Sequence, residues 1–129
     1  MFSFEKLEVW QLAVEFCDDI YRITRGIPAN ERFGLSSQLR RAAVSIAANT
    51  TEGSDRGSKK DFARFVEIAY GSLAEVVTEL KIAKRQGMLS ESDLKLAYDK
   101  AERLGQMLSR LRSSLNASTP QRSTLNDSQ

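Results

Sequence analysis

The sequence predicts an all-α protein, an antiparallel up-down-up-down four-helix bundle. Four long stretches place apolar residues at alternating spacings of three and four, the period of one helical face, and no strand-like alternation competes with them. Two prolines and seven glycines in 129 residues are few, which favours long helices over many-turned β architecture. A chain of this length forms one domain and buries about two thirds of its surface, so its core needs no disulfide or metal.

The first helix is predicted between about Phe4 and Thr24, and Gly26 and Pro28 end it. One row with helical spacing predicts an apolar face: Leu7, Trp10, Val14, Cys17, Tyr21 and Thr24. A second apolar row lies beside the first: Leu12, Phe16, Ile20 and Ile23. Two rows make the apolar sector wider than a simple two-helix contact needs, which favours a homo-oligomer.

The second helix is predicted from Ser36, whose hydroxyl can cap free amides, to about Gly53. Small alanines beside its apolar row let another backbone approach closely, so we expect this helix to be central. The row consists of Leu35, Leu39, Ala42, Ile46 and, at its end, the polar Asn49. Glu52 follows Asn49 three residues later. We interpret Asn49 and Glu52 as structural polar residues that fix the helix register or support the next loop. The alternative is a ligand or nucleic-acid contact.

The third and fourth helices are predicted to begin with serine caps at Ser58 and Ser90, each followed three residues later by aspartate. The third carries one apolar stripe and ends at Gly87: Phe62, Phe65, Ala69, Leu73, Val76, Leu80 and Ala83. The fourth follows a strict repeat of three and four: Leu94, Ala97, Ala101, Leu104, Leu108, Leu111 and Leu115. We therefore assign residues 1–115 to the bundle domain and residues 116–129 to a polar, disordered tail.

Composition excludes most catalytic chemistry. The chain has no histidine, which removes Ser-His-Asp triads, Cys-His pairs and histidine metal sites. The single cysteine, Cys17, cannot form an intramolecular disulfide or a thiolate zinc cluster. We predict no enzyme activity, no metal and no cofactor. The absence of a long apolar run and of a signal-peptide pattern predicts a cytoplasmic protein without membrane contact.

Basic residues gather in clusters although the net charge is only +2. We predict six of them as nucleic-acid contacts, with Arg56, Lys59 and Lys60 together at one end of the bundle: Arg40, Arg41, Arg56, Lys59, Lys60 and Arg64. A monomer of charge +2 is a weak phosphate binder. An oligomer that repeats one patch multiplies the local field.

Several motifs resemble one bacterial family. They are Phe4-x-x-Leu7-x-Val9-Trp10-Gln11-x-Ala13, Ile27-Pro28-x-x-Glu31-x-Phe33-Gly34-Leu35-Ser36, Arg40-Arg41-Ala42-Ala43-x-Ser45-Ile46-x-x-Asn49 ending in Glu52-Gly53, and Phe62-x-Arg64-Phe65. Over roughly residues 2–115 the chain resembles the four-helix-bundle proteins encoded in intervening sequences of 23S ribosomal RNA genes. That family is similar to the accessory variability proteins of diversity-generating retroelements. Thr50-Thr51 stands where the family pattern reads Ile-Ala.

The resemblance implies a four-helix bundle that assembles as a ring-like homopentamer and has no established enzymatic activity. For the retroelement relatives it implies binding of nucleic acid and a reverse transcriptase through a basic surface. We therefore hypothesise a non-catalytic homo-oligomer that binds RNA or DNA. The alternative is a protein-binding scaffold ring with no nucleic-acid role, in which Arg40 and Arg41 form ion pairs between subunits.

Overall fold

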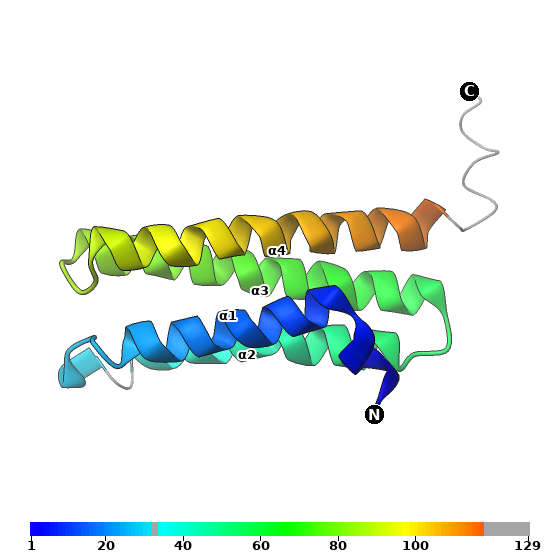
Figure 1. Cartoon of the computed structure of the whole chain (residues 1–129), viewed down its shortest axis with the longest axis horizontal. Coiled ribbons are helices and arrows are strands. Elements are labelled where there is room, and N and C mark those ends of the chain that lie inside the picture. Colours follow the sequence, from blue (N-terminus) through cyan, green and yellow to red (C-terminus); the bar gives the residue numbers. More distant parts are fainter. Residues whose placement is uncertain (32–33, 118–129) are drawn as a thin grey trace, which may run out of the picture.

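The computed structural model describes residues 1–31 and 34–117, which form a four-helix bundle. Figure 1 shows the helices lying along one another, each running opposite to the one before it, and α2 packs against both α1 and α3. No strand occurs in residues 1–31 or 34–117. The all-α prediction is confirmed. The helices are α1 (Glu8–Thr24), α2 (Leu35–Ser54), α3 (Lys59–Arg85) and α4 (Glu91–Ala117), with short 3-10 helices at η1 (Ser3–Lys6) and η2 (Ala29–Glu31).

Of the two apolar rows predicted on α1, the second faces the core and the first lies mostly at its edge. The helix starts at Glu8, and its fully buried side chains include Phe16 and Ile20. Val14 is 37% exposed and Tyr21 is 39% exposed, and both belong to the first predicted row. Both rows have the helical period, so periodicity alone cannot say which one faces inward.

Trp10 lies at the edge of the core, half-buried, instead of within it. Its ring packs edge-on against the ring of Phe4 in η1, with centroids 5.3 Å apart. The N-terminal 3-10 turn thus covers the indole, where the sequence predicted one continuous helix from Phe4. The rest of the core is built as expected from large apolar side chains of all four helices: Phe16, Ile20, Leu39, Ile46, Leu80, Leu104 and Leu108.

The end of α2 and the start of α3 approach closely at Gly53. A Cβ atom at this position would lie 2.8 Å from Phe62 Cδ1 and 2.8 Å from Phe65 Cβ. Farther along the same pair of helices, the hydroxyls of Ser45 and Ser72 share a hydrogen bond of 2.9 Å. Small residues on α2 therefore let α3 pass at short range, as expected for a central helix.

Serine caps start α3 and α4, as predicted. Ser58 Oγ accepts a hydrogen bond from the Asp61 N–H at 3.1 Å, and Ser90 Oγ accepts one from the Asp93 N–H at 3.1 Å. The predicted cap at Ser36 is wrong: α2 starts one residue earlier, after Gly34, and Ser36 is buried in its first turn.

The fourth helix continues two residues beyond the predicted domain boundary. It includes Asn116 and Ala117, which we assigned to the polar tail, and the remaining tail residues 118–129 lie outside the described residues. Within the described part of the chain, no helix has both the length and the apolar character needed to cross a membrane.

Candidate nucleic-acid interface

The structure separates the six predicted nucleic-acid contacts into two groups. Arg40 and Arg41 lie in the second turn of α2, close to the connections between α1 and α2 and between α3 and α4. Arg56 lies at the other end of the bundle, in the connection from α2 to α3 (Figure 1). Arg56 follows Arg40 by sixteen residues, and a helical rise of about 1.5 Å per residue places them about 24 Å apart. The six residues do not form a single patch on one chain.

At the α2–α3 end, carboxylates alternate with the basic residues. Arg56 Nη2 lies 2.9 Å from Glu52 Oε2, and the Arg56 guanidinium lies 4.7 Å from the ring centroid of Phe65. Arg64 lies over the same ring, 4.9 Å from its centroid. Between residues 52 and 64 there are four basic residues and three acidic ones, so the local charge is only +1: Glu52, Asp55, Arg56, Lys59, Lys60, Asp61 and Arg64.

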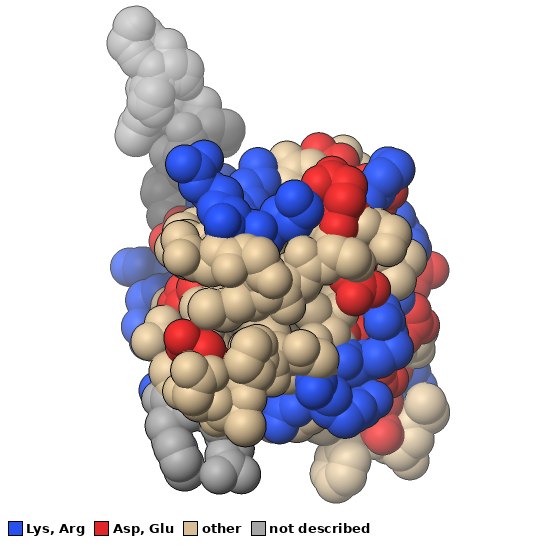
Figure 2. Space-filling model, turned by 90° about the vertical axis from the view of Figure 1, so that its left-hand side faces the viewer, with Lys and Arg blue, Asp and Glu red and all other residues tan. Residues whose placement is uncertain are grey.

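At the opposite end, the last turn of α1 and the first turns of α2 enclose a groove of about 770 Å³. We call it the α1–α2 groove, and its lining residues are Tyr21, Thr24, Arg25, Ile27, Pro28, Ala29, Ser36, Ser37, Arg40, Arg41 and Val44. Three of them are arginines, and no carboxylate is among these described lining residues. Figure 2 looks onto this end of the bundle and shows Lys and Arg side chains around a mostly uncharged centre.

Arg40 is held in a fixed position within the α1–α2 groove. Its Nε donates to Thr24 Oγ1 at 2.7 Å, and its Nη2 donates to the Tyr21 carbonyl oxygen at 3.4 Å. Thr24 is 3% exposed, and its hydroxyl donates to the Ile20 carbonyl oxygen at 2.7 Å. The guanidinium also lies 4.5 Å from the ring centroid of Tyr21. The Arg40 guanidinium is therefore already positioned before a ligand binds, so binding costs little side-chain entropy.

Arg25 and Arg41 supply exposed charge beside Arg40. Both are exposed, and Arg41 Nη2 donates to Ser37 Oγ at 3.2 Å. Arg25 was absent from our sequence prediction because it follows α1 as its C-cap residue, far along the chain from Arg40 and Arg41 of α2. Its position just before Gly26, where the helix turns back toward α2, is the signal that could have found it.

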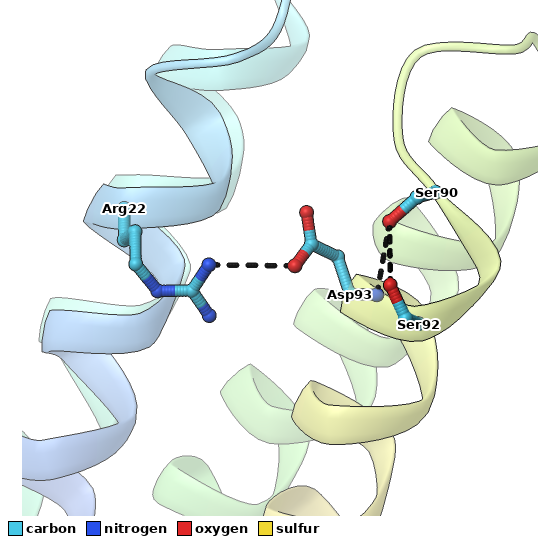
Figure 3. Close-up of polar contacts among 4 residues, drawn as sticks. All are labelled: Arg22, Ser90, Ser92 and Asp93. Atoms are coloured by element: carbon cyan, nitrogen blue, oxygen red, sulfur yellow. Dashed lines mark hydrogen bonds and ion pairs between the residues drawn. The ribbon is translucent and has the colours of Figure 1, made fainter.

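Two other basic residues near this end are paired with carboxylates. Arg22 of α1 pairs with Asp93 at the start of α4, with Nη1 3.3 Å from Oδ1 (Figure 3). The Asp93 N–H in turn donates to Ser90 Oγ, so the residue that Ser90 caps also connects α4 to α1. Lys84 lies 3.4 Å from Glu91. By contrast, the three groove arginines form no ion pair with any described residue.

The contacts of Asn49 and Glu52 fit their interpretation as structural residues. Asn49 Nδ2 donates to the Ser45 carbonyl oxygen and to Ser45 Oγ, both at 2.9 Å, and Ser45 Oγ bonds Ser72 Oγ of α3. This chain of bonds joins α2 to α3 and satisfies the half-buried amide. Glu52 is exposed and holds Arg56 in the following turn.

Two titratable groups outside the groove have shifted pKa values. Burial raises the pKa of the Cys17 thiol to about 11, with a further contribution from the negative charge of Asp18, so the thiolate nucleophile is disfavoured. Burial also raises the pKa of Glu79 to about 7, helped by a hydrogen bond and charge repulsion from Glu75. Among the described residues, no cluster of three or more potential ligands could hold a metal ion.

Known proteins resemble this chain in sequence pattern and in fold. No curated protein sequence matches it significantly. A crystal structure from Bacteroides thetaiotaomicron VPI-5482, described as a protein of unknown function from the S23 ribosomal protein family, superposes with a TM-score of 0.76. The two chains are 21% identical, and the match covers 81% of this chain and 95% of the other. That similarity supports the bundle fold alone.

The family pattern itself covers most of the bundle. The sequence model described as 23S rRNA-intervening sequence protein matches residues 5–110, from η1 into the last turns of α4. The matched region includes the α1–α2 groove and both serine-capped helix starts. The chain therefore belongs to the family of 23S rRNA-intervening sequence proteins.

Proposed function

We propose that this protein is a non-catalytic, cytoplasmic homo-oligomer that binds RNA or DNA through the phosphate backbone. The observation that carries the proposal is the α1–α2 groove, where Arg25, Arg40 and Arg41 meet without a carboxylate among the described lining residues. Guanidinium groups bind phosphate oxygens through charge-assisted and often bidentate hydrogen bonds. Arg40 makes two hydrogen bonds within the bundle, which leaves three of its five N–H donors for a phosphate.

Assembly would compensate for the small net charge. The proposed homopentamer, which the family resemblance implies, has five copies at +2 each and a total charge of about +10. It also presents five α1–α2 grooves to one long nucleic acid, so weak single contacts gain avidity. The exposed apolar residues Val14 and Ile68 support assembly, because a second copy can cover them.

Paired charge reversals test which end of the bundle binds. The full-length protein is titrated into fluorescently labelled RNA at two salt concentrations, as wild type, as Arg25→Glu/Arg41→Glu and as Lys59→Glu/Lys60→Glu. Both double variants change the charge of each chain by the same amount. We expect binding by the wild type that weakens with salt, a large loss in the groove variant and a small loss in the control. Equal losses would show that only total charge matters, and a wild type without affinity at low salt would refute the proposal.

The second candidate function is a protein-binding scaffold ring without a nucleic-acid role. A second groove of about 710 Å³ between α3 and α4 supports it, because its lining includes Tyr70, Leu73, Val77 and Tyr98. Light scattering on the same charge-reversal variants separates the two functions. If Arg41 forms ion pairs between subunits, Arg25→Glu/Arg41→Glu will dissociate the assembly. If the groove binds nucleic acid, the assembly will stay intact while RNA binding is lost.

A further inference from the structure

We infer that the α1–α2 groove is built for single-stranded nucleic acid, with one base stacked on Tyr21 beside the phosphate-binding arginines. The inference rests on the proposed function, because it names the class of nucleic acid that the same groove would take. It adds an aromatic contact that binding through phosphates alone would not need.

Tyr21 has the features of a stacking platform. Its side chain projects from α1 outside the buried row of that helix, and the residue is 39% exposed. The Arg40 guanidinium lies 4.5 Å from the ring centroid, and the bond from Arg40 to buried Thr24 holds that guanidinium in place. The ring is therefore supported on one side, and an incoming base loses little ordering entropy when it stacks on this arrangement.

The rest of the groove matches the two parts of a nucleotide. Ile27 and Val44 provide apolar lining for a base, while Arg25 and Arg41 provide charge for the adjoining phosphates. The volume of about 770 Å³ lies within the range of about 300–1,000 Å³ typical of small-molecule sites. In a duplex, the faces of the bases are already stacked on one another. Only an unpaired strand can offer a base to Tyr21.

The inference is tested by comparing single-stranded with duplex RNA. The probes are a fluorescently labelled oligouridine of about ten nucleotides and an RNA duplex of similar length. They are titrated against the full-length wild type, Tyr21→Leu, Tyr21→Phe and the control Tyr70→Leu. Tyr70 is 45% exposed on α3, so the control removes an equally accessible tyrosine outside the α1–α2 groove. The oligomer mass of each variant is measured by light scattering.

We expect the wild type to prefer the single strand. Tyr21→Leu should weaken single-strand binding by about tenfold, the effect of losing one base stack, while duplex binding changes by less than about twofold. Tyr21→Phe and Tyr70→Leu should both retain wild-type affinity. A loss of assembly in Tyr21→Leu would overturn the inference, because Tyr21 would then be an intersubunit contact.

Two further outcomes separate this inference from the proposed function. Salt-dependent binding of both probes with equal affinity would overturn the single-strand preference and leave phosphate binding by the groove intact. Absence of binding to both probes at low salt would overturn the inference together with the proposed function.

Discussion

Arg40 of α2 donates its Nε–H to the buried hydroxyl oxygen of Thr24 on α1, at 2.7 Å. The bond joins two helices at the mouth of the α1–α2 groove and gives Arg40 a structural role besides its proposed contact with phosphate. Arg41, the next residue, hydrogen-bonds among the described residues only to Ser37 of its own helix. The fold therefore depends more on Arg40 than on the adjacent Arg41.

Arg40→Ala should lower the free energy of unfolding by about 1–2 kcal/mol, because Thr24 and the Tyr21 carbonyl each lose a partner. Arg41→Ala should change it by less than about 0.5 kcal/mol, since an exposed side chain with one local bond contributes little. Urea denaturation of the two variants provides the measurement. Equal destabilisation would contradict the assigned role of Arg40.

Gly53→Ala should destabilise the bundle by about 1–3 kcal/mol, because the added methyl group would meet Phe62 and Phe65 at 2.8 Å. Gly71→Ala in the middle of α3 is the matched control. A Cβ at Gly71 has no described neighbour within 4 Å, so this variant should gain about 0.5–1 kcal/mol from helix propensity. Opposite shifts in thermal midpoint are expected, and a stabilised Gly53→Ala variant would contradict the close approach of α2 and α3.

The contribution of Glu79 to the free energy of unfolding should fall as pH rises from about 4.5 to about 7, the window between the ordinary and the raised pKa of Glu79. In that window the folded state keeps the Glu79 proton and the unfolded state releases it, so rising pH favours unfolding. Glu79→Gln removes the ionisation and should flatten this part of the stability profile. Urea midpoints across the pH range test the effect, with the exposed Glu102→Gln as control. If Glu79→Gln left the dependence of stability on pH unchanged, the raised pKa of Glu79 would be refuted.

Trp10→Ala should cost about 1–2 kcal/mol, whereas Phe16→Ala should cost about 3–5 kcal/mol. Phe16 is 0% exposed in the core, while Trp10 is half-buried against Phe4. Chemical denaturation of the two variants measures the difference. A larger loss for Trp10→Ala would restore the α1 face that the sequence predicted.

The bundle and its fourth helix could be predicted from the sequence because their signals are local and unambiguous. The heptad pattern of α4 identifies Ala97, Leu104 and Leu108 as core residues, and all three are buried. The face of α1 could not be predicted, because its two apolar rows have the same period. The choice depends on which row the neighbouring helices cover, which is a property of the tertiary packing.

The candidate site was predicted only in part, for a similar reason. Charge clustering along the chain identified Arg40 and Arg41, but it gave the same role to the separate cluster around Arg56, about 24 Å away. Arg25 was missed because its proximity to Arg41 comes from the reversal of the chain between α1 and α2. Local sequence patterns do not encode such a juxtaposition.

The salt dependence of single-stranded RNA binding tests the central claim most directly. The binding constant is measured over a series of salt concentrations for the wild type, Arg25→Ala/Arg41→Ala and Lys59→Ala/Lys60→Ala. If the α1–α2 groove neutralises phosphates, the groove variant will bind with a logarithmic salt slope shallower by about 1.4, or about 0.7 for each lost phosphate contact. The control should keep the wild-type slope. An unchanged slope in the groove variant would contradict the assignment of the α1–α2 groove as the nucleic-acid interface.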